Sequence, residues 1–273
     1  MRDSSLLPLL IEPDELQSHL HNPNLLIVDM NRAETYAEVH LPHAIHLEYN
    51  SLVRKEPPAM GMLPSETELA NILGAIGLTP DRHVVAYDEE GNSRTTRLLW
   101  TLSVLGHDRY SLLNGGLEAW QEEDRPVTAV PVQPTPSPYT AQFKRANDVV
   151  DKDWILQHLR DPDVQLLDTR SPGEYEGRIL RAARGGHIPG AINFDYVNAM
   201  DTARALRLKP AVALRELLQE AGVNDKKEIV VYCQTHHRSS HTFFVLKYLG
   251  FPRVKAYPGS WSEWGNLPET PIE

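Results

Sequence analysis

The sequence is short of cysteine and of positive charge. Its 273 residues include a single cysteine, Cys233, so an internal disulfide is excluded. A free thiol suits a reducing compartment, and we expect a cytoplasmic protein. The 27 lysines and arginines stand against 37 acidic residues, which gives a net charge of −10. Nucleic acid and anionic membrane surfaces are therefore not expected as partners, because they repel a chain of this charge.

Long apolar runs are lacking as well. No stretch approaches the roughly 18 apolar residues that a membrane-spanning helix needs. The N-terminal segment 6–11 is too short, and too interrupted by proline, for the hydrophobic region of a signal peptide. What the chain does have is 41% hydrophobic residues, enough for one or two packed domains.

Short apolar runs alternate with segments of helical character. The predicted buried strands cover residues 25–28, 84–87, 110–113, 164–168 and 229–232. Helices are expected from Pro13, over 65–77 and 95–105, and from Ser239 to Leu249, the last with a serine as its N-cap. This alternation predicts an α/β protein built on small open parallel sheets with helices on both faces. Such sheets bind ligands at the carboxyl ends of their strands.

The second half of the sequence repeats the first at an offset of about 145 residues. His40-Leu41-Pro42-His43-Ala44 matches His187-Ile188-Pro189-Gly190-Ala191, and Trp120 matches Trp264. When the two halves are aligned in this way, Cys233 matches Asp88. Two copies indicate a duplicated domain, so the chain is expected to hold two similar units.

Five prolines between Arg125 and Thr140 mark the junction of the two halves. Proline at this density favours an extended, semi-rigid chain. We therefore predict an N-terminal domain over 1–125, a linker over 126–140 and a C-terminal domain over 141–273. A polyproline recognition segment is the alternative interpretation of the linker.

Cys233 stands where a predicted strand passes into a loop and then a helix. Free backbone N–H groups and the positive end of the helix dipole favour the thiolate form there. Arg238, at the end of the loop, can bind an oxyanion through paired N–H donors. A thiolate in this setting is a good nucleophile and can accept a second sulfur atom to form a persulfide.

Other interpretations of Cys233 remain open from the residues alone. A lone cysteine can be a small buried hydrophobe. Together with His236, His237 and His241 it could form a zinc site, although a loop curled around the thiol would turn adjacent histidines outward. A Cys-His hydrolase would need a separately positioned base.

With these motifs, the chain resembles a tandem-domain rhodanese of the thiosulfate sulfurtransferase family along nearly its whole length. The resemblance rests on the 233–239 loop, the paired His40 and His187 segments, and Gly259-Ser260-Trp261-Ser262-Glu263-Trp264. The loop Cys-Gln-Thr-His-His-Arg is similar to that of the bacterial two-domain type.

The resemblance implies two rhodanese-like domains, the N-terminal one catalytically inactive, which fits Asp88 at the cysteine position. It implies that Cys233 is catalytic and carries the persulfide, without a cofactor or a metal. The substrate-binding residues that it implies are Arg238, Gln234, Thr235, His236, His237 and Ser239.

The implied activity is that of a thiosulfate:cyanide sulfurtransferase with a double-displacement mechanism. Sulfur would pass from a small anionic donor such as thiosulfate to cyanide or another thiophilic acceptor. The alternative is a persulfide carrier that delivers sulfur to a biosynthetic protein partner. A Cdc25-like phosphatase or an arsenate reductase is favoured least, because those enzymes resemble Cys-x5-Arg, one residue longer than the loop here.

Two departures concern the donor. Mitochondrial rhodaneses resemble Cys-Arg-Lys-Gly, with several cations, whereas this loop has one arginine and two histidines. Those enzymes also carry a basic residue where this chain has Glu174. The mercaptopyruvate branch resembles Cys-Gly-Ser-Gly, which this chain lacks. The physiological donor and the roles of His236, His237 and Glu174 therefore stay open.

Several further polar residues have structural interpretations. Asp29 is expected to anchor a turn by accepting backbone amides, and Asp168 either does the same or acts on the thiol. His187 is expected to be structural, and Trp261 and Trp264 to pack in a core or between domains. We expect four further basic side chains to be solvated and not to attract anions toward the site: Arg178, Arg181, Arg184 and Lys209.

Overall fold

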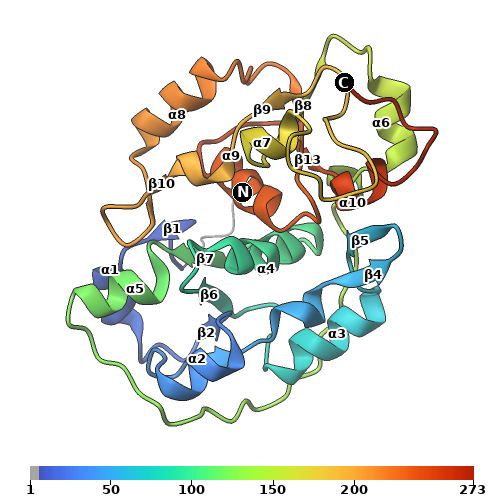
Figure 1. The fold of residues 1–273 in the computed structure, drawn as a ribbon. Helices are drawn as coiled ribbons and strands as arrows, with labels where there is room; N and C mark the ends of the chain where they lie inside the picture. The colour runs from blue at the N-terminus through green and yellow to red at the C-terminus, as the bar shows by residue number, and fades with distance from the viewer. Residues whose placement is uncertain (1–5) are drawn as a thin grey trace. The chain divides into compact units, whose positions relative to one another are not determined.

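The computed structural model describes residues 6–273 (Figure 1). The expectation that the N terminus carries no signal segment falls partly on residues 1–5, outside this range. The chain forms two compact units. The first unit contains the residues up to Leu52 together with Pro64–Arg145 and Asp201–Leu208. The second contains Val53–Leu63, Ala146–Met200 and Lys209–Glu273.

The first unit is built on a five-stranded parallel sheet in the order β1-β7-β6-β2-β3. Its strands are β1 Leu10–Ile11, β2 Leu25–Asp29, β3 Ile45–His46, β6 His83–Tyr87 and β7 Tyr110–Leu113. The central strands β2 and β6 are buried along their whole length. Burial on both faces explains why these strands read as continuous apolar runs in the sequence.

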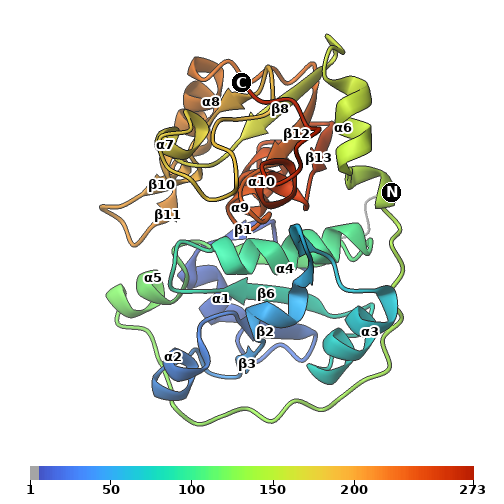
Figure 2. The same ribbon diagram turned by 45° about the vertical axis from the view of Figure 1, so that its right-hand side comes forward.

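Helices cover both faces of this first sheet. They are α1 Pro13–His19, α2 Ala33–Glu38, η1 Tyr49–Leu52, α3 Glu66–Ala75, α4 Ser93–Val104 and α5 Gly116–Glu122. Ile27 and Val85 face a core that includes Leu16 of α1 and Trp120 of α5. Helix α4 contacts β6 and β7, and Figure 2 shows it above β6. The side chains of each strand thus alternate between two packed layers.

The second unit repeats this plan around a four-stranded parallel sheet in the order β13-β12-β8-β9. Its strands are β8 Val164–Asp168, β9 Ile192–Asn193, β12 Glu228–Tyr232 and β13 Val254–Ala256. Its helices are η2 Ala146–Asp148, α6 Lys152–His158, α7 Pro172–Tyr175, η3 Tyr196–Ala199, α8 Ala211–Glu220, α9 Arg238–Tyr248 and α10 Ser260–Trp264.

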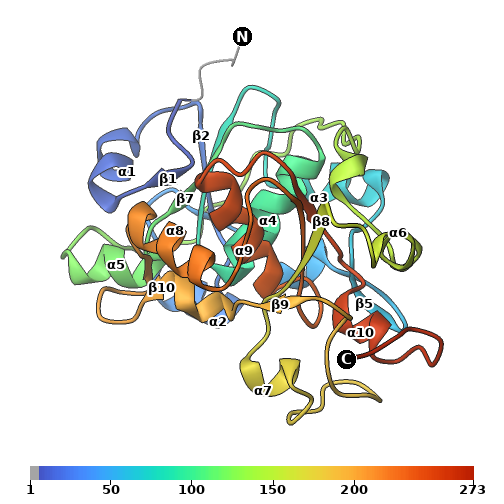
Figure 3. The same ribbon diagram turned by 90° about the horizontal axis from the view of Figure 1, so that it is seen from above.

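The core on one face of the second sheet joins Val230 and Tyr232 to Ile155 of α6 and to Trp261 and Trp264 of α10. Helix α9 packs against β12 and β13. Figures 2 and 3 show α6 on one side of β8 and α8 on the other. The expected fold class, α/β with helices on both faces of small parallel sheets, is confirmed, and the tryptophans are core residues.

Each unit also takes a hairpin from the other half of the sequence. The antiparallel pair β4 Arg54–Glu56 and β5 Ala59–Met62 belongs to the second unit, where β5 packs on α10. The turn that leads from β10 Met200–Asp201 to β11 Arg207–Leu208 belongs to the first unit. The two hairpins follow η1 and η3, the same point of each repeat. The compact units therefore do not coincide with two uninterrupted halves of the chain.

The proline-rich segment 126–140 runs along the first unit. Ser137 donates its backbone N–H to the Gly74 carbonyl over 2.9 Å, and Val132 donates to the Tyr36 hydroxyl over 3.1 Å. These bonds attach the predicted linker to one unit. Among the described residues, no helix is both long and apolar enough to cross a membrane.

Candidate active site

Cys233 follows the last residue of β12, at the carboxyl end of the second sheet. Residues 234–237 form a turn, and α9 begins at Arg238. The thiol is buried and unpaired with any other cysteine. This is the strand-to-helix position that the sequence predicts, and it directs the amides of the loop toward the sulfur.

The short helix α10 holds the backbone of this loop from behind. The N–H of Trp261 donates to the Cys233 carbonyl and that of Ser262 to the Gln234 carbonyl, each over 2.9 Å. The Cys233 amide donates to the Ser260 hydroxyl over 3.4 Å. While α10 holds the Cys233 and Gln234 carbonyls, the amides of Thr235 and Ser239 bond the sulfur.

The hairpin β4–β5 supports the same loop within the second unit. The N–H of Met60 donates to the Ser262 hydroxyl over 3.1 Å. At Gly61 the two backbones come so close that a Cβ atom would lie 2.2 Å from the Thr235 carbonyl oxygen and 2.6 Å from that of Pro258. Only glycine allows this approach. No local pattern predicts this contact, because Gly61 lies more than 170 residues before the loop.

Opposing effects act on the Cys233 thiol. Burial raises its pKa, but the charge of Arg238 and hydrogen bonds from the Ser239 hydroxyl and from the amides of Ser239 and Thr235 lower it. The effects that lower the pKa outweigh burial, so the pKa of Cys233 lies below its usual range. The arrangement favours a thiolate and stabilises any anion that sits in its place.

Arg238 is held by Glu174, a residue of α7. Its two terminal guanidinium nitrogens donate to the two oxygens of Glu174 over 2.6 and 2.9 Å. The side chain of Glu174 is 5% exposed and that of Arg238 22%. Despite its burial, hydrogen bonds and the charge of Arg238 lower the pKa of Glu174 to about 2. The cation beside the cysteine thus has a fixed carboxylate counter-ion, which gives Glu174 a defined place in the site.

The histidines of the loop do not turn outward as expected. His236 is completely buried, because its left-handed backbone (φ +53°) directs the ring inward, where Nδ1 lies 2.7 Å from the Ser239 hydroxyl. His237 is half-buried and serves as the N-cap of α9. The expected serine cap is therefore wrong. Ser240 lies inside the first turn and donates to the His237 carbonyl over 2.6 Å.

Gln234 links the loop to the segment after α7. Its side-chain amide donates to the Arg181 carbonyl over 2.9 Å. The seven predicted site residues are consecutive in sequence; the loop holds residues 233–237, and Arg238 and Ser239 lie in the first turn of α9. Their functional roles stay predictions.

Other polar residues singled out in the sequence have structural partners. Asp168 forms a buried ion pair with Arg170, whose guanidinium also donates to the Gly186 carbonyl over 2.7 Å. His187 stacks on Tyr175 with ring centroids 3.6 Å apart. The guanidinium of Arg184, expected to be solvated, instead donates to the carbonyls of residues Trp264, Leu267 and Thr270. It ties down the C-terminal segment.

In the first unit, Asp88 occupies the place that matches Cys233. One of its carboxylate oxygens accepts the amides of Glu90 and Asn92 over 2.8 and 2.7 Å. The other accepts the amide and the hydroxyl of Thr95 over 2.9 and 3.0 Å. The carboxylate of Asp88 therefore occupies the space that its own loop could offer to an anion.

Asp29 ends β2 as expected. Its carboxylate accepts hydrogen bonds from the Asn31 amide over 2.8 Å and from the Tyr87 hydroxyl.

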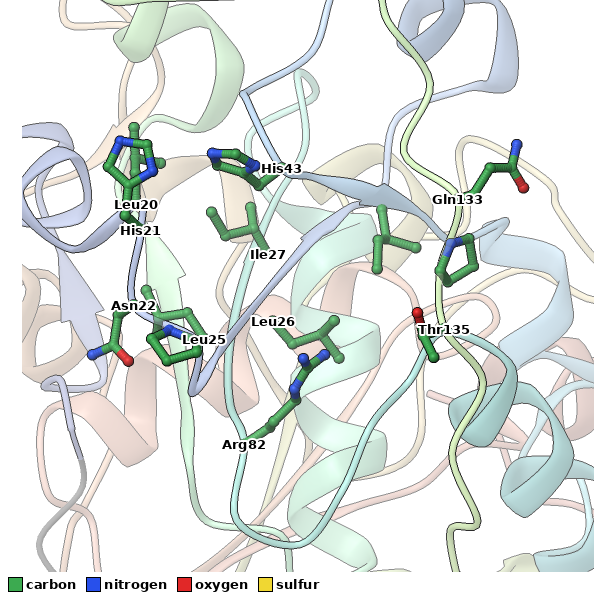
Figure 4. A pocket seen from close by; sticks show the side chains of 13 residues that line it. Leu20, His21, Asn22, Leu25, Leu26, Ile27, His43, Arg82, Gln133 and Thr135 are labelled. Carbon is green, nitrogen blue, oxygen red and sulfur yellow. The ribbon is translucent and has the colours of Figure 1, made fainter.

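The first unit also has a cavity of about 360 Å³ beside the amino ends of β2 and β6. Figure 4 shows His43, Arg82 and Thr135 among its lining side chains. This cavity lies at the end of the sheet opposite to Asp88.

Among residues 6–273, no group of three or more His, Cys, Asp or Glu side chains could hold a metal ion.

Comparison with known proteins agrees with this architecture. The rhodanese-like domain family matches residues 12–123 and 151–267. A thiosulfate sulfurtransferase of Azotobacter vinelandii is 44% identical over 273 residues, which cover all of both chains. One from Pseudomonas aeruginosa is also 44% identical, over 98% of this chain and 97% of its own. A sulfur carrier protein, TtuD, of Thermus thermophilus is 35% identical over 97% of this chain and 96% of its own.

A solved structure with the same fold is that of an anaerobic ergothioneine biosynthesis enzyme from Chlorobium limicola, in complex with trimethyl histidine. It matches with a TM-score of 0.87 at 24% identity, over 97% of this chain and 70% of its own. At this identity the likeness shows the fold alone.

A duplicated α/β unit with a cysteine-centred anion loop in its second copy defines a class of sulfur-handling proteins. The chain belongs to the rhodanese family. Relatives that align with the chain over nearly its full length confirm the prediction of a sulfurtransferase that acts on sulfur-containing substrates.

Proposed function

We propose that the chain transfers sulfane sulfur through a persulfide on Cys233. The observation that carries this proposal is the buried thiol whose pKa is lowered by Arg238, Ser239 and Thr235. A cradle that stabilises a thiolate also stabilises the terminal sulfur anion of a persulfide, because both place negative charge against fixed N–H donors.

The reaction would be a double displacement. The Cys233 thiolate attacks the outer sulfur of thiosulfate, so that a sulfur–sulfur bond to the cysteine forms and the bond to the sulfonate breaks, releasing sulfite. Cyanide then attacks the terminal sulfur, the sulfur–sulfur bond to Cys233 breaks, and thiocyanate leaves, which regenerates the thiolate. Another thiophile would take up the same sulfur atom and leave as its own sulfur adduct. Thiosulfate is the donor proposed first, because both 44% identical relatives are thiosulfate sulfurtransferases.

The remaining loop residues would act in binding. Arg238 has three N–H donors beyond the two that contact Glu174, and through these it would bind the oxyanion of the donor. Gln234, Thr235, His236, His237 and Ser239 would shape the cradle. The free thiol suits a reducing compartment, so we propose that the protein acts in the cytoplasm.

Steady-state formation of thiocyanate from thiosulfate and cyanide tests this function. Wild-type protein should turn over, and Cys233→Ala should not. Full activity in Cys233→Ala would refute the mechanism. For Arg238→Ala the expected result is mainly a raised KM for anionic donors, since the thiol remains in place.

A second candidate is a persulfide carrier that delivers sulfur to a protein acceptor. The ion pair between Arg238 and Glu174 favours it, because a cancelled charge weakens the attraction for small anions. So does the 35% identical relative that is a sulfur carrier protein. A carrier should load with sulfur but form thiocyanate slowly, and should lose its persulfide quickly to an acceptor protein.

A further inference from the structure

Glu174 of α7 pairs with the arginine that lies in the active-site loop region. It lies in α7, 64 residues before Arg238 in sequence, yet it receives both terminal nitrogens of that side chain. Two parallel charge-assisted hydrogen bonds form the most specific geometry available to an arginine and a carboxylate. The cation next to the reactive thiol is therefore fixed by one particular residue.

The carboxylate is itself anchored on its other side. Its N-terminal neighbour Ser171 donates to Glu174 Oε2 from the hydroxyl over 3.0 Å and from the backbone N–H over 3.3 Å. The Ser171 hydroxyl in turn accepts the Glu174 amide over 3.4 Å, which completes a capping box. With four polar hydrogens donated to one carboxylate, Glu174 stays ionised and in place.

Arg238 links the two negative groups of the site. Its guanidinium pairs with Glu174 through two hydrogen bonds, and its charge also acts on the Cys233 thiol. One positive charge is thus shared between two negative groups. Arg181 Nε lies 4.0 Å from Glu174 and its side chain is 64% exposed, so solvent screens its charge. Glu174 therefore offsets part of the attraction that Arg238 exerts on an anion approaching the thiolate.

We propose that Glu174 is a specificity-determining residue that disfavours sulfur donors with two negative charges relative to donors with one. This inference rests on the proposed function, because it concerns sulfur loading of Cys233. The Coulomb energy between a fixed charge and a ligand scales with the charge of the ligand. A carboxylate behind Arg238 therefore penalises a dianion about twice as much, in free energy, as it penalises a monoanion.

Two donors separate these cases with the same chemistry. Thiosulfate is a dianion and releases sulfite. An arenethiosulfonate is a monoanion whose outer sulfur passes to the thiolate in the same way, with an arenesulfinate as the leaving group. Each reaction forms one sulfur–sulfur bond at Cys233 and breaks one sulfur–sulfur bond in the donor, with charge conserved.

The test is the second-order rate constant for loading sulfur-free protein, followed by mass spectrometry, with each donor. The key variant is Glu174→Gln, which removes the charge but can keep the capping box. We expect loading to rise roughly threefold with the arenethiosulfonate and roughly tenfold with thiosulfate, as one unit charge is removed from a partly screened site. Higher ionic strength should reduce both gains.

The matched control is Glu176→Gln. Glu176 lies at the end of the same helix, its side chain is 50% exposed, and it pairs with Arg178 on the surface. Glu176→Gln makes the same change in net charge as Glu174→Gln. Because solvent screens a charge at this exposed position, both rate constants should stay within about twofold of wild type. Glu174→Asp, which keeps the charge, should keep the wild-type ratio of the two donors.

The outcomes are distinct. An unchanged ratio in Glu174→Gln, or an equal fall with both donors, would show a positioning role alone and overturn the proposal. A similar gain in Glu176→Gln would also overturn it, since net charge would then be the cause. If wild-type protein takes up no sulfur from either donor, the proposed function itself fails, and this inference fails with it.

Discussion

Substituting Gly61 tests whether the hairpin β4–β5 positions the sulfur-binding loop. In Gly61→Ala the new methyl group would lie 2.2 Å from the Thr235 carbonyl oxygen and 2.6 Å from the Pro258 carbonyl oxygen. Both neighbours are backbone atoms, so a side-chain rotation cannot relieve the contact. To reach an ordinary contact distance, the hairpin or the loop must move by about 1 Å.

The magnitude follows from that displacement. Overpacking of this kind costs about 1–3 kcal/mol in the free energy of unfolding. The amide of Thr235 also bonds the Cys233 sulfur, so a shift of this residue disturbs the cradle as well. Misplacement by about 1 Å at a reacting centre can cost about 100-fold in rate. We expect the turnover of thiosulfate and cyanide to fall by about 10- to 100-fold.

The assay pairs urea unfolding with thiocyanate formation, and its control is Gly222→Ala. Gly222 has φ +86° and no atom near the added methyl group, so alanine there strains the backbone without a clash. We expect a loss of about 1 kcal/mol and unchanged turnover. If Gly61→Ala retains turnover within twofold of wild type, or if both variants lose the same activity, the hairpin does not position the loop.

Two further predictions concern ionisation and the inactive repeat. The rate of sulfur loading should rise with pH through a midpoint below that of an unperturbed thiol, because the pKa of Cys233 is lowered. Arg238→Gln should move this midpoint upward, since the charge of Arg238 is one cause of the lowered pKa. An unchanged midpoint would remove Arg238 as the cause. Asp88→Ala should lower the free energy of unfolding by about 3 kcal/mol or more, since the amides of Glu90, Asn92 and Thr95 lose their acceptor. Urea unfolding checks this, and a loss below 1 kcal/mol would contradict it; Asp88→Asn, which keeps one acceptor oxygen, should lose less.

Local patterns in the sequence were sufficient for the central strands of both sheets and for the reactive loop, but not for the short strands β1, β3, β9 and β13. Strand β12 is a run of apolar residues with a cysteine directly after it, and β6 is a similar run with Asp88 in that place. Signals of this kind lie within about ten consecutive residues, where burial and backbone preference act together. The repeat added the alignment of Asp88 with Cys233, which the structure explains as a carboxylate filling its own amide cradle.

Contacts between distant segments were not accessible in the same way. Strands β4 and β5 are short and β4 is exposed, so the sequence of residues 54–62 carries no period that would assign them to the second unit. The pairing of Glu174 with Arg238 joins residues 64 positions apart. His236 was expected outside because a loop curled around the thiol would turn adjacent histidines outward, but its left-handed backbone conformation places it inside. Each miss concerns a direction or a partner that is set by tertiary structure.

The central claim is that Cys233 carries the transferred sulfur, and intact-protein mass spectrometry tests it most directly. Wild-type protein incubated with thiosulfate and then desalted should gain the mass of one sulfur atom, and cyanide should remove that gain. Because the chain has a single cysteine, Cys233→Ala should show no gain at all. A sulfur gain that persists in Cys233→Ala, or wild-type protein that takes up no cyanide-labile sulfur, would contradict the account.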